Sequence, residues 1–298
     1  MVDNPAGYSY DNKAIREDLA SMITNVSPRE NSLLYGLPTT SAMQPIHQWL
    51  NDTLATPGAN AKAEGADATF AARTNPTRDI NYCQIIAKPI MVTGSDEVAN
   101  AAGYAGGRMA YEIEKALKEY ANDTEFALMR GTLVCGSGTT ARSLKGLKAF
   151  ASTLATSQSG ISLSESILID HLDNGWEQGV NFKECYVGKT LKKRINSFVG
   201  NSTLFQDPTD KRLVNSIDIY ETTNGPIKIF RHRYVTIAGD TNNDLVTLDP
   251  EHVAIAYYRK PKVTDIATTG DAEKKLLLGE KTLEVRTEKA VGLIQRLL

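Results

Sequence analysis

Large apolar side chains are nearly absent from one stretch of the chain, residues 56–79, with the sequence TPGANAKAEGADATFAARTNPTRD. It contains no Val, Ile, Leu or Met, and Phe70 is its one aromatic residue. A segment this poor in apolar side chains cannot bury enough surface to offset its ordering entropy. Loops longer than about 12 to 15 residues are uncommon in compact domains, where they usually act as lids, binding loops or linkers. The pattern therefore predicts a lid, a binding loop or a linker.

Alternating apolar positions flank this stretch. On its C-terminal side the alternation predicts one strand that continues past Pro89, with one face formed by Ile80, Tyr82, Gln84, Ile86, Ile90 and Val92. On the other side lies IHQWLNDTL (residues 46–54). The two flanks and the polar stretch together have the form of a long loop with two legs.

Helical spacing of apolar residues marks two further segments. A short helix that ends before Pro28 is predicted by Leu19, Met22, Ile23 and Val26. A helix roughly 35 to 50 Å long is predicted from Asp96 to about Arg130, with a stripe formed by Met109, Ile113, Ala116, Tyr120, Thr124 and Ala127. Because this stripe is narrow and its flanks are charged, we expect the long helix to lie across a sheet or a neighbour.

The second half of the chain mixes helices and strands. A capping box from Ser162 to Glu165 predicts a helix start, with Leu168, Leu172 and Trp176 on one side of the helix. A strand at ECYVG (184–188) precedes a helix at KTLKKRINSFVGN (189–201), and Asn224-Gly225 predicts a hairpin turn. Further strands follow at LVTLDPEHVAIAYY and KTLEVRTEKAVGLI. Since the order lacks βαβ regularity, it favours the α+β class.

Composition narrows the class of protein. The 298 residues carry a formal net charge of −2, so the chain lacks the electrostatic footprint of a dedicated DNA-binding protein. Three widely spaced cysteines without a C-x-x-C motif indicate neither a disulfide framework nor a zinc site. No signal-peptide pattern opens the chain, and no stretch approaches the roughly 20 apolar residues that span a bilayer. We expect a soluble protein that is not exported by these routes.

Candidate chemistry is sparse. Gly136–Ala141 matches the G-x-G-x-x-A form of the dinucleotide fingerprint, but no strand ending in an acidic residue follows, which favours a plain glycine turn. The basic run from Lys189 to Arg194 is better explained by a solvated helix face than by nucleic-acid contact, and Asp249-Pro250 by a turn. The four histidines lack metal-ligand spacing and favour surface or strand positions. We therefore expect no catalytic residue, no metal site and no cofactor.

Five stretches carry a family likeness: DLASMITNVSPRENSLL (18–34), HQWLNDTL (47–54), AKAEGADAT (61–69), TLDPEHVAIAYYRKP (247–261) and GEKTLEVRTEKAVGLI (279–294). In this order they resemble the major capsid proteins of tailed bacteriophages, the Hong Kong phage-type capsid fold family. The resemblance covers most of the chain. It implies an α+β fold with an N-terminal arm, an extended loop, a peripheral domain with a long spine helix, and an axial domain. The arm before Asp18 and the polar KEYANDTE (118–125) depart from the expected pattern.

The resemblance also implies a division of the chain into five regions. These are an N-terminal arm and short helix (1–44), an extended loop (45–92), a peripheral domain with the spine helix (93–156), an axial domain (157–262), and C-terminal strands returning to both domains (263–298).

The implied function is structural and not enzymatic: self-assembly into the icosahedral shell that encloses phage DNA. The implied partners are further copies of the chain, as pentamers and hexamers, with scaffold, portal and decoration proteins, and packaged DNA held weakly and non-specifically. No membrane is involved, and the implied location is the virion capsid after assembly in the host cytoplasm. Residues 56–79 then match the tip of the extended loop, lying over a neighbouring subunit. The candidate intersubunit contacts are Lys62, Glu64, Asp67, Phe70, Arg73, Arg78 and Asp79.

Two alternatives stay open. A non-viral compartment shell would share the fold and would differ by binding cargo at its inner surface; residues 18–34 favour the phage protein. A nucleotide-binding enzyme rests only on Gly136–Ala141. Some family members crosslink covalently through a Lys and an Asn, but solubility alone explains Lys62, so we do not expect crosslinking.

Overall fold

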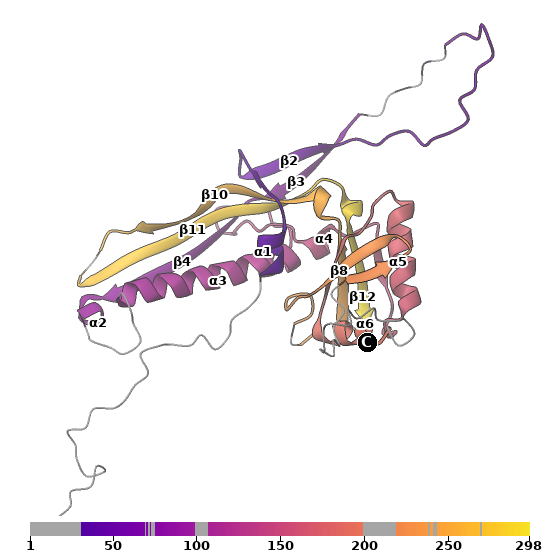
Figure 1. Cartoon of the computed structure of the whole chain (residues 1–298). Helices are drawn as coiled ribbons and strands as arrows, with labels where there is room; N and C mark the ends of the chain where they lie inside the picture. Colours follow the sequence, from indigo (N-terminus) through magenta and orange to yellow (C-terminus); the bar gives the residue numbers. More distant parts are fainter. Residues whose placement is uncertain are drawn as a thin grey trace, which may run out of the picture.

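The computed structural model describes residues 31–68, 70, 72, 75–98, 107–198, 219–237, 239–240, 243–268 and 270–298. The arm and short helix predicted within residues 1–30 lie outside the described residues, as do Arg73 and residues 199–218. Figure 1 shows an elongated limb of sheet and helix, a more compact part that contains the C-terminus, and a loop that projects from the limb.

A four-stranded sheet forms the limb, in the order β1-β10-β11-β4. β1 runs parallel to β10, whereas β10, β11 and β4 pair antiparallel. β4 is an edge strand and can therefore contain Pro89, which has no N–H to donate to a ladder. The strand bounds are β1 (Thr39–Ser41), β10 (Val253–Asp265), β11 (Ala272–Val285) and β4 (Gln84–Thr93).

The long helix α3 (Arg108–Arg130) lies along one face of this sheet (Figure 1). Its apolar stripe packs into one cluster with β4 and β11, formed by Met109, Ala116, Tyr120, Ile86, Ile90, Val92 and Leu277. The expectation of a helix lying across a sheet is confirmed. The single helix predicted from Asp96 is confirmed only from Arg108 onward, because α2 (Gly94–Val98) is a separate short helix and residues 99–106 are not described.

The phase of α3 can be tested with two adjacent substitutions. Ile113 packs partly buried against the cluster, whereas Glu114 is exposed and paired with Lys118 at 2.7 Å. We expect Ile113→Asp to lower the free energy of unfolding by about 2 to 4 kcal/mol, since it places an unpaired carboxylate against apolar side chains. Glu114→Ala should change it by less than about 0.5 kcal/mol. Denaturant unfolding of both variants is the measurement, and equal stabilities would contradict this phase.

The single strand predicted across residues 80–92 is wrong: the structure has two strands, β3 (Thr77–Tyr82) and β4, which pair in different sheets. The break falls at Cys83, which is fully buried. Its N–H donates to the Pro45 carbonyl at 2.8 Å, and its carbonyl accepts from the Arg142 guanidinium. These contacts turn the chain out of one ladder and into the next.

A six-stranded sheet forms the compact part, in the order β5-β12-β9-β6-β8-β7. β5 is parallel to β12 and β6 is parallel to β8; the other neighbours are antiparallel. The connections β9–η3–β10 and β11–η4–β12 join the two sheets. The bounds are β5 (Ala155–Ser157), β6 (Glu184–Val187), β7 (Ile219–Thr222), β8 (Gly225–Arg231), β9 (Asn243–Leu248), β12 (Val291–Leu297), η3 (Pro250–His252) and η4 (Glu288–Ala290).

Helix α5 (Glu165–Glu177) starts later than the capping box predicts. The N-cap is Ser164, whose backbone is extended and whose hydroxyl accepts from the Ile167 N–H at 3.3 Å. The prediction that Trp176 shares the face of Leu168 and Leu172 is also wrong. Trp176 is 62 % exposed, and Gly175 faces the core, where Phe182 leaves no room for a Cβ.

The hairpin predicted near Asn224 is confirmed as β7 and β8, with its turn one residue earlier than expected. Thr222 pairs with Gly225, so Thr223 and Asn224 form the turn. Gly225 has φ +109°, a value that favours glycine, and it closes the ladder. Pro226 lies opposite Glu221 inside the hairpin and does not lengthen the turn.

Three polar residues that the sequence placed at the surface or in strands are buried, so these expectations are wrong. On α6 (Lys189–Phe198), Lys192 is 8 % exposed and donates to the Ile229 carbonyl at 3.0 Å. His171 on α5 is buried beside the Thr247 hydroxyl, and burial lowers its pKa to about 4. His232, which follows β8, is 3 % exposed.

The five-region division stays a prediction. β4 and β10 belong to the same four-stranded sheet, although that division places one in the extended loop and the other in the axial domain. The short helices that complete the fold are α1 (Ser32–Gly36) and α4 (Leu147–Phe150).

Candidate assembly surface

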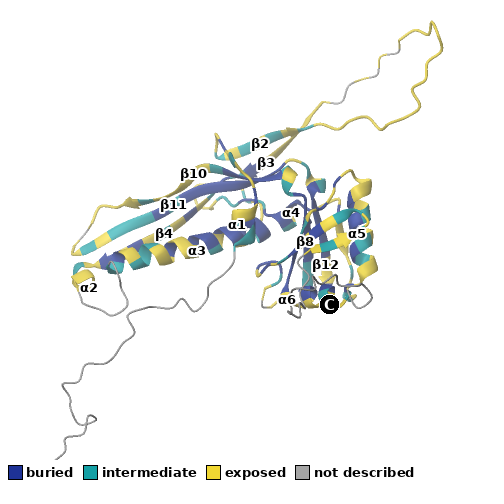
Figure 2. Ribbon diagram, in the orientation of Figure 1, coloured by how far each residue is buried: buried dark blue, intermediate teal, exposed yellow. Residues whose placement is uncertain are grey.

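The polar stretch forms the tip of a loop carried by a two-stranded ribbon. β2 (Ile46–Asn51) pairs antiparallel with β3 from Ile46–Tyr82 to Asn51–Thr77. Every described residue between the strands is exposed, including Leu54 at 98 % and Phe70 at 96 %. Figure 2 shows this exposure along the whole described loop, well away from the buried strands. The loop therefore adds nothing to the core of its own subunit.

The sequence-predicted contact residues fall into two groups. Lys62, Glu64, Asp67 and Phe70 lie in the exposed loop, and within the described part of the chain no ion pair joins the three charged ones to any residue. Arg78 and Asp79 lie on β3, opposite Leu50 and Trp49.

The two β3 candidates face opposite sides of the ribbon, because successive residues of a strand alternate. Arg78 is on the outer side, whereas Asp79 is on the inner side and accepts a hydrogen bond from the Asn51 amide. Asp79 is therefore engaged within its own ribbon. Arg73, the remaining candidate, lies outside the described residues.

The outer side of the ribbon carries apolar residues that the sequence-based list omits. Ile46, Leu50 and Ile80 are 43 %, 66 % and 37 % exposed, and the ladder register places them on one side. Met43, just before β2, is 82 % exposed. The sequence offered only a weak signal, because Ile46 and Leu50 share their side of the strand with the polar Gln48.

The inner side of the ribbon is anchored to the body of the subunit. His47 Nε2 lies 2.8 Å from Glu284 Oε2 on β11, and the Trp49 ring packs against Phe150. Burial favours the neutral form of Glu284, but hydrogen bonds from His47 and Arg286 outweigh it and lower the pKa of Glu284. Such anchoring fixes the direction in which the ribbon leaves the subunit.

Asn81 secures the base of the ribbon. Its side chain is fully buried and satisfied on both ends: the amide donates to the carbonyls of Lys145 (3.1 Å) and Leu283 (2.7 Å). Its oxygen accepts from the N–H groups of Lys145 (2.8 Å) and Tyr82 (2.9 Å). A buried amide with all these partners specifies one geometry, since any shift leaves a polar group unpaired.

A second anchor at the base involves the loop that contains Gly136–Ala141. Arg142 from this loop and Arg259 from β10 both donate to the carboxylate of Glu280, which is 2 % exposed. The glycine-rich segment lies between the partners of an isolated bridge, Val134 and Ser143. The strand–turn–helix setting of the dinucleotide fingerprint is therefore not present at this segment.

The four-stranded sheet has an open face on the side opposite α3. On β11, Leu277 and Lys281 face α3, so Leu276, Leu278 and Glu284 face the other way. The ribbon covers the Glu284 end of this face through His47. Beyond the ribbon the face continues with partly exposed apolar residues, whose members are Leu276, Leu278, Ile85, Ala87, Pro89 and Met91. We call these six residues the open sheet face.

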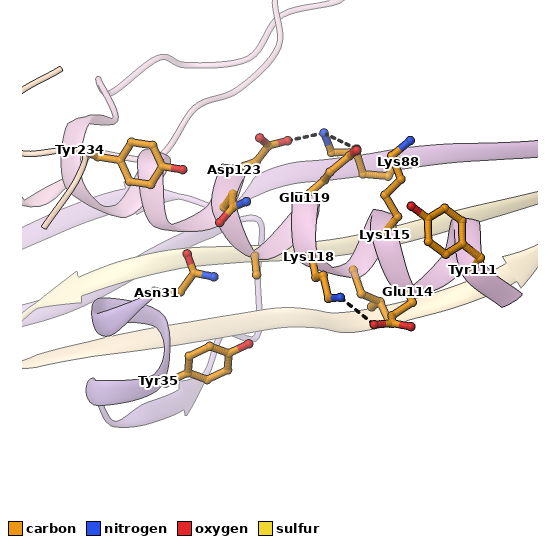
Figure 3. Close-up of a pocket in the computed structure, with 13 residues that line it drawn as sticks. Asn31, Tyr35, Lys88, Tyr111, Glu114, Lys115, Lys118, Glu119, Asp123 and Tyr234 are labelled. Carbon is orange, nitrogen blue, oxygen red and sulfur yellow. Dashed lines mark hydrogen bonds and ion pairs between the residues drawn. The ribbon is translucent and has the colours of Figure 1, made fainter. Parts of the chain in front are cut away.

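A groove of about 840 Å³ follows α3 between Tyr111 and Tyr234 (Figure 3). Three lysines and three acidic residues line it, and most are already paired with one another. Lys88 lies 2.7 Å from Asp123 and 3.7 Å from Glu119, and the Lys118–Glu114 pair measures 2.7 Å. The groove has the mixed charge of a polar protein contact.

A buried carboxylate joins three parts of the fold. Glu125 on α3 is fully buried and accepts from the N–H groups of Leu33 (2.8 Å) and Leu34 (2.9 Å), at the start of α1. It also accepts from His232 Nε2 at 2.8 Å, while His232 Nδ1 accepts from the Tyr234 N–H at 3.2 Å. Sequence reasoning missed this cluster. Its signal was the unexpected polarity of KEYANDTE, which contains Glu125.

No helix among the described residues is long and apolar enough to cross a membrane. Within the same residues, no group of three or more His, Cys, Asp or Glu side chains is arranged to hold a metal ion.

Comparison of the sequence with protein families gives a match along almost the whole chain. The family model described as "SU10 major capsid protein" matches residues 4–298. The major capsid protein of Escherichia phage Phieco32 is 32% identical over 125 residues, 41% of this chain and 35% of that protein. The match thus spans about a third of the length of this curated relative.

Comparison with solved structures shows the fold. A cyanophage A-1(L) capsid chain is similar with a TM-score of 0.69 at 13% identity, covering 95% of this chain and 97% of that one. A capsid chain of a native GTA particle has a TM-score of 0.68 at 10% identity, with 96% of each chain covered. The holo-SrpI encapsulin complex from Synechococcus elongatus has a TM-score of 0.62 at 8% identity, covering 94% and 91%.

Proposed function

The chain belongs to the SU10 major capsid protein family, and from this premise we propose that it self-assembles, through pentamers and hexamers, into the icosahedral shell that encloses phage DNA. The role is structural, and the proposal includes no catalytic step. The expected α+β capsid fold, with its extended loop and spine helix, is confirmed by the structural likeness to phage capsid chains.

The extended loop is the observation that carries the proposal. All of its described residues are exposed, and Leu54 and Phe70 are almost fully so. Ordering a free loop costs on the order of 1 to 2 kcal/mol per residue. No contact within the subunit offsets this cost for the described loop residues, whose hydrogen bonds are local. Contacts with a neighbouring copy would supply the missing stabilisation.

The open sheet face is the surface on which we place the ribbon and loop of a neighbouring copy. The chain's own ribbon already covers one end of this face, and both surfaces carry exposed apolar side chains. In a ring of identical copies, a ribbon that leaves each subunit in one fixed direction meets the same surface of the next. Ile46, Leu50 and Ile80 of one copy would then continue the cover over Leu276, Leu278 and Met91 of another.

The charged residues of the loop serve as partners for the rim of that contact. Lys62, Glu64 and Asp67 carry both signs, which suits pairing with a neighbour more than burial. The groove along α3, with its mixed charges, is the second candidate contact. Arg78 on the outer side of the ribbon belongs to the same surface as Leu50.

Further parts of the proposal concern partners and place. We assign the protein to the virion capsid after assembly in the host cytoplasm, with scaffold, portal and decoration proteins as additional partners. The encapsulin likeness is a likeness of fold, at 8% identity. A compartment shell of the same fold would enclose protein cargo, whereas a phage shell encloses DNA.

Particle formation by the purified full chain tests the proposal. Sedimentation velocity at micromolar concentration, with any required scaffold protein supplied, should show pentamers, hexamers or closed shells, and electron microscopy should show icosahedral particles. A species that remains monomeric under all these conditions would contradict the proposal. Particles that retain a specific protein cargo and exclude DNA would favour the compartment shell.

A further inference from the structure

A cluster of cations lies beside the groove along α3, and the capsid proposal gives none of these cations a role. Lys189, Arg231 and Arg233 line a hollow of about 690 Å³, beside Phe126 and Tyr234. All three cations are exposed, and the described part of the chain offers none of them a salt bridge. They form the set that we call the basic hollow.

Strand topology brings these cations together. β6 and β8 are parallel neighbours, with Val187 paired to Arg231, so the carboxyl ends of both strands meet at one edge of the sheet. Lys189 follows the end of β6 and Arg231 closes β8. The His232 N–H donates to the Val187 carbonyl at 2.8 Å, which keeps the two chain segments together beyond the ladder.

The backbone that carries the two arginines is held rigidly. His232 lies between them, and its buried ring donates to Glu125 at 2.8 Å. Tyr234, the next residue after Arg233, packs edge-on against Phe126 with ring centroids 5.6 Å apart. With His232 turned inward, Arg231 and Arg233 are both presented outward from an anchored segment. Preorganised cations lose less freedom on binding an anion than cations on a mobile loop.

The positive charge of the hollow is not neutralised by the described acidic residue that lines it. Among the described residues that line the hollow, the one acidic residue is Asp240, which is engaged by Arg130 at 2.7 Å and by the Ile237 N–H at 3.1 Å. The hydrogen bond from Arg130 is the main reason that the pKa of Asp240 is lowered. Three cations thus face solvent beside an acid that is already paired, in a chain whose net charge is −2. Such local concentration of one sign indicates an anionic partner.

The position of the hollow indicates which side of a shell it faces. Phe126 lies on α3 outside the stripe that packs on the sheet, whereas the ribbon contacts the opposite face of that sheet through His47 and Glu284. In a single-layered shell held together by lateral contacts, these two sides become the inner and outer surfaces. An inward hollow would face the enclosed DNA, and arginine binds phosphate with two parallel hydrogen bonds.

We propose that Lys189, Arg231 and Arg233 form a contact site for the phosphate backbone of packaged duplex DNA on the inner surface of the shell. This inference rests on the proposed capsid function and adds residues to it. The contact involves no base and is independent of sequence. It is also weak and sensitive to salt, since each phosphate contact releases condensed counterions.

Binding of a labelled 30-base-pair duplex of mixed sequence to unassembled full-length protein tests the site, by fluorescence anisotropy between 50 and 200 mM NaCl. We expect Arg231→Gln/Arg233→Gln to bind at least about tenfold more weakly at 50 mM NaCl. The slope of log K against log salt should flatten by about two, one per lost phosphate contact. Circular dichroism should be unchanged, because both side chains are exposed.

The matched control is Lys115→Gln/Lys118→Gln, which removes the same charge from lysines on α3 that are paired with Glu112 and Glu114. It should stay within about threefold of the wild-type affinity. An equal loss of DNA affinity in both variants would show that only the net charge of the protein matters, and it would overturn the proposed site. Polyglutamate that competes as well as DNA at equal charge would overturn the assignment to phosphate in favour of an acidic polypeptide.

Closed shells provide the second measurement. DNA added outside closed particles should bind wild type and Arg231→Gln/Arg233→Gln alike, because the hollow is enclosed. A difference that persists in closed particles would place the hollow on the outer surface and overturn the inference. Shell formation is scored separately by electron microscopy, so failure to assemble would contradict the capsid proposal without changing the binding result for unassembled protein.

Discussion

A subunit in which residues 52–76 are replaced by Asn-Gly is expected to fold normally and to form no stable shell. Asn51 and Thr77 are the last pair of the β2–β3 ladder, so a two-residue turn can close the ribbon there. The removed residues that the structure describes are all exposed, and their loss takes nothing from the core. Their contacts with a neighbour, repeated around every capsomer, would be lost at once, and small losses per contact multiply in a closed assembly.

Circular dichroism and denaturant unfolding measure the fold of this variant, and sedimentation with electron microscopy measures assembly. We expect the free energy of unfolding to stay within about 1 kcal/mol of wild type. The matched control keeps the loop length and changes only its two large apolar residues, Leu54→Ser and Phe70→Ser. It should weaken shells without abolishing them. Closed particles of normal stability from the shortened subunit would contradict the role of the loop.

Replacing Lys281 with Met is expected to stabilise the subunit at neutral pH. Lys281 on β11 is 1 % exposed, and its Nζ lies 4.5 Å from the centre of the Tyr120 ring and 5.3 Å from that of Tyr257. The Thr124 hydroxyl, at 3.0 Å, accepts its hydrogen bond, and no ion pair to Lys281 is found in the described residues. Burial lowers the pKa of Lys281 to about 7. The folded subunit therefore favours the neutral amine.

The pH dependence follows from the two pKa values. In the unfolded chain the lysine keeps a pKa near 10.5, so above that pH it is neutral in both states and carries no charge penalty. As the pH falls from 10.5 to about 7, Lys281 is protonated in the unfolded chain but stays mostly neutral in the folded subunit. The free energy of unfolding therefore decreases progressively over this range. Below about 7 the penalty is complete. Lys281→Met removes this penalty but also loses the hydrogen bond and the ring contacts. We expect the free energy of unfolding to rise by roughly 2 to 4 kcal/mol at pH 7.

Denaturant unfolding of wild type and Lys281→Met at pH 7, 8.5 and 10 measures this effect. The difference between the two proteins should shrink as the pH rises and be small at pH 10. Lys118→Met is the control, since Lys118 is an exposed lysine on α3, and its effect should not vary over this range. A destabilised Lys281→Met, or a gain that is constant from pH 7 to 10, would show that the amine is charged and satisfied in the folded state.

Local pattern predicted the parts of the fold in which one element meets one apolar surface. The stripe of α3 runs through Met109, Ala116 and Tyr120 because each turn of a helix returns the same side to the sheet. The hairpin of β7 and β8 followed from turn chemistry within a few residues. The polar loop followed from composition alone, since a segment with so few large apolar residues cannot build or join a core.

The candidate site was predicted only in outline. The contact residues stay a prediction: sequence reasoning included Asp79, which is hydrogen-bonded inside the ribbon, and did not include the exposed Ile46 and Leu50. The side of a strand on which a residue lies depends on ladder register and on the surface that the strand covers. Neither the register nor the covered surface can be derived from the composition of the loop.

The sequence by itself determined the α+β class, the long loop and most of the long helix, because these depend on periodicity and on the scarcity of large apolar residues; the capsid family came from the resemblance of five stretches. Only the tertiary structure decided the break at Cys83, the burial of Glu125, His232 and Lys281, and the meeting of Lys189 with Arg231. The physical reason is sequence distance: Glu125 and His232 are 107 residues apart, and Lys281 is 157 residues from Thr124. Polar residues become buried partners only when the packing of distant elements removes water from both.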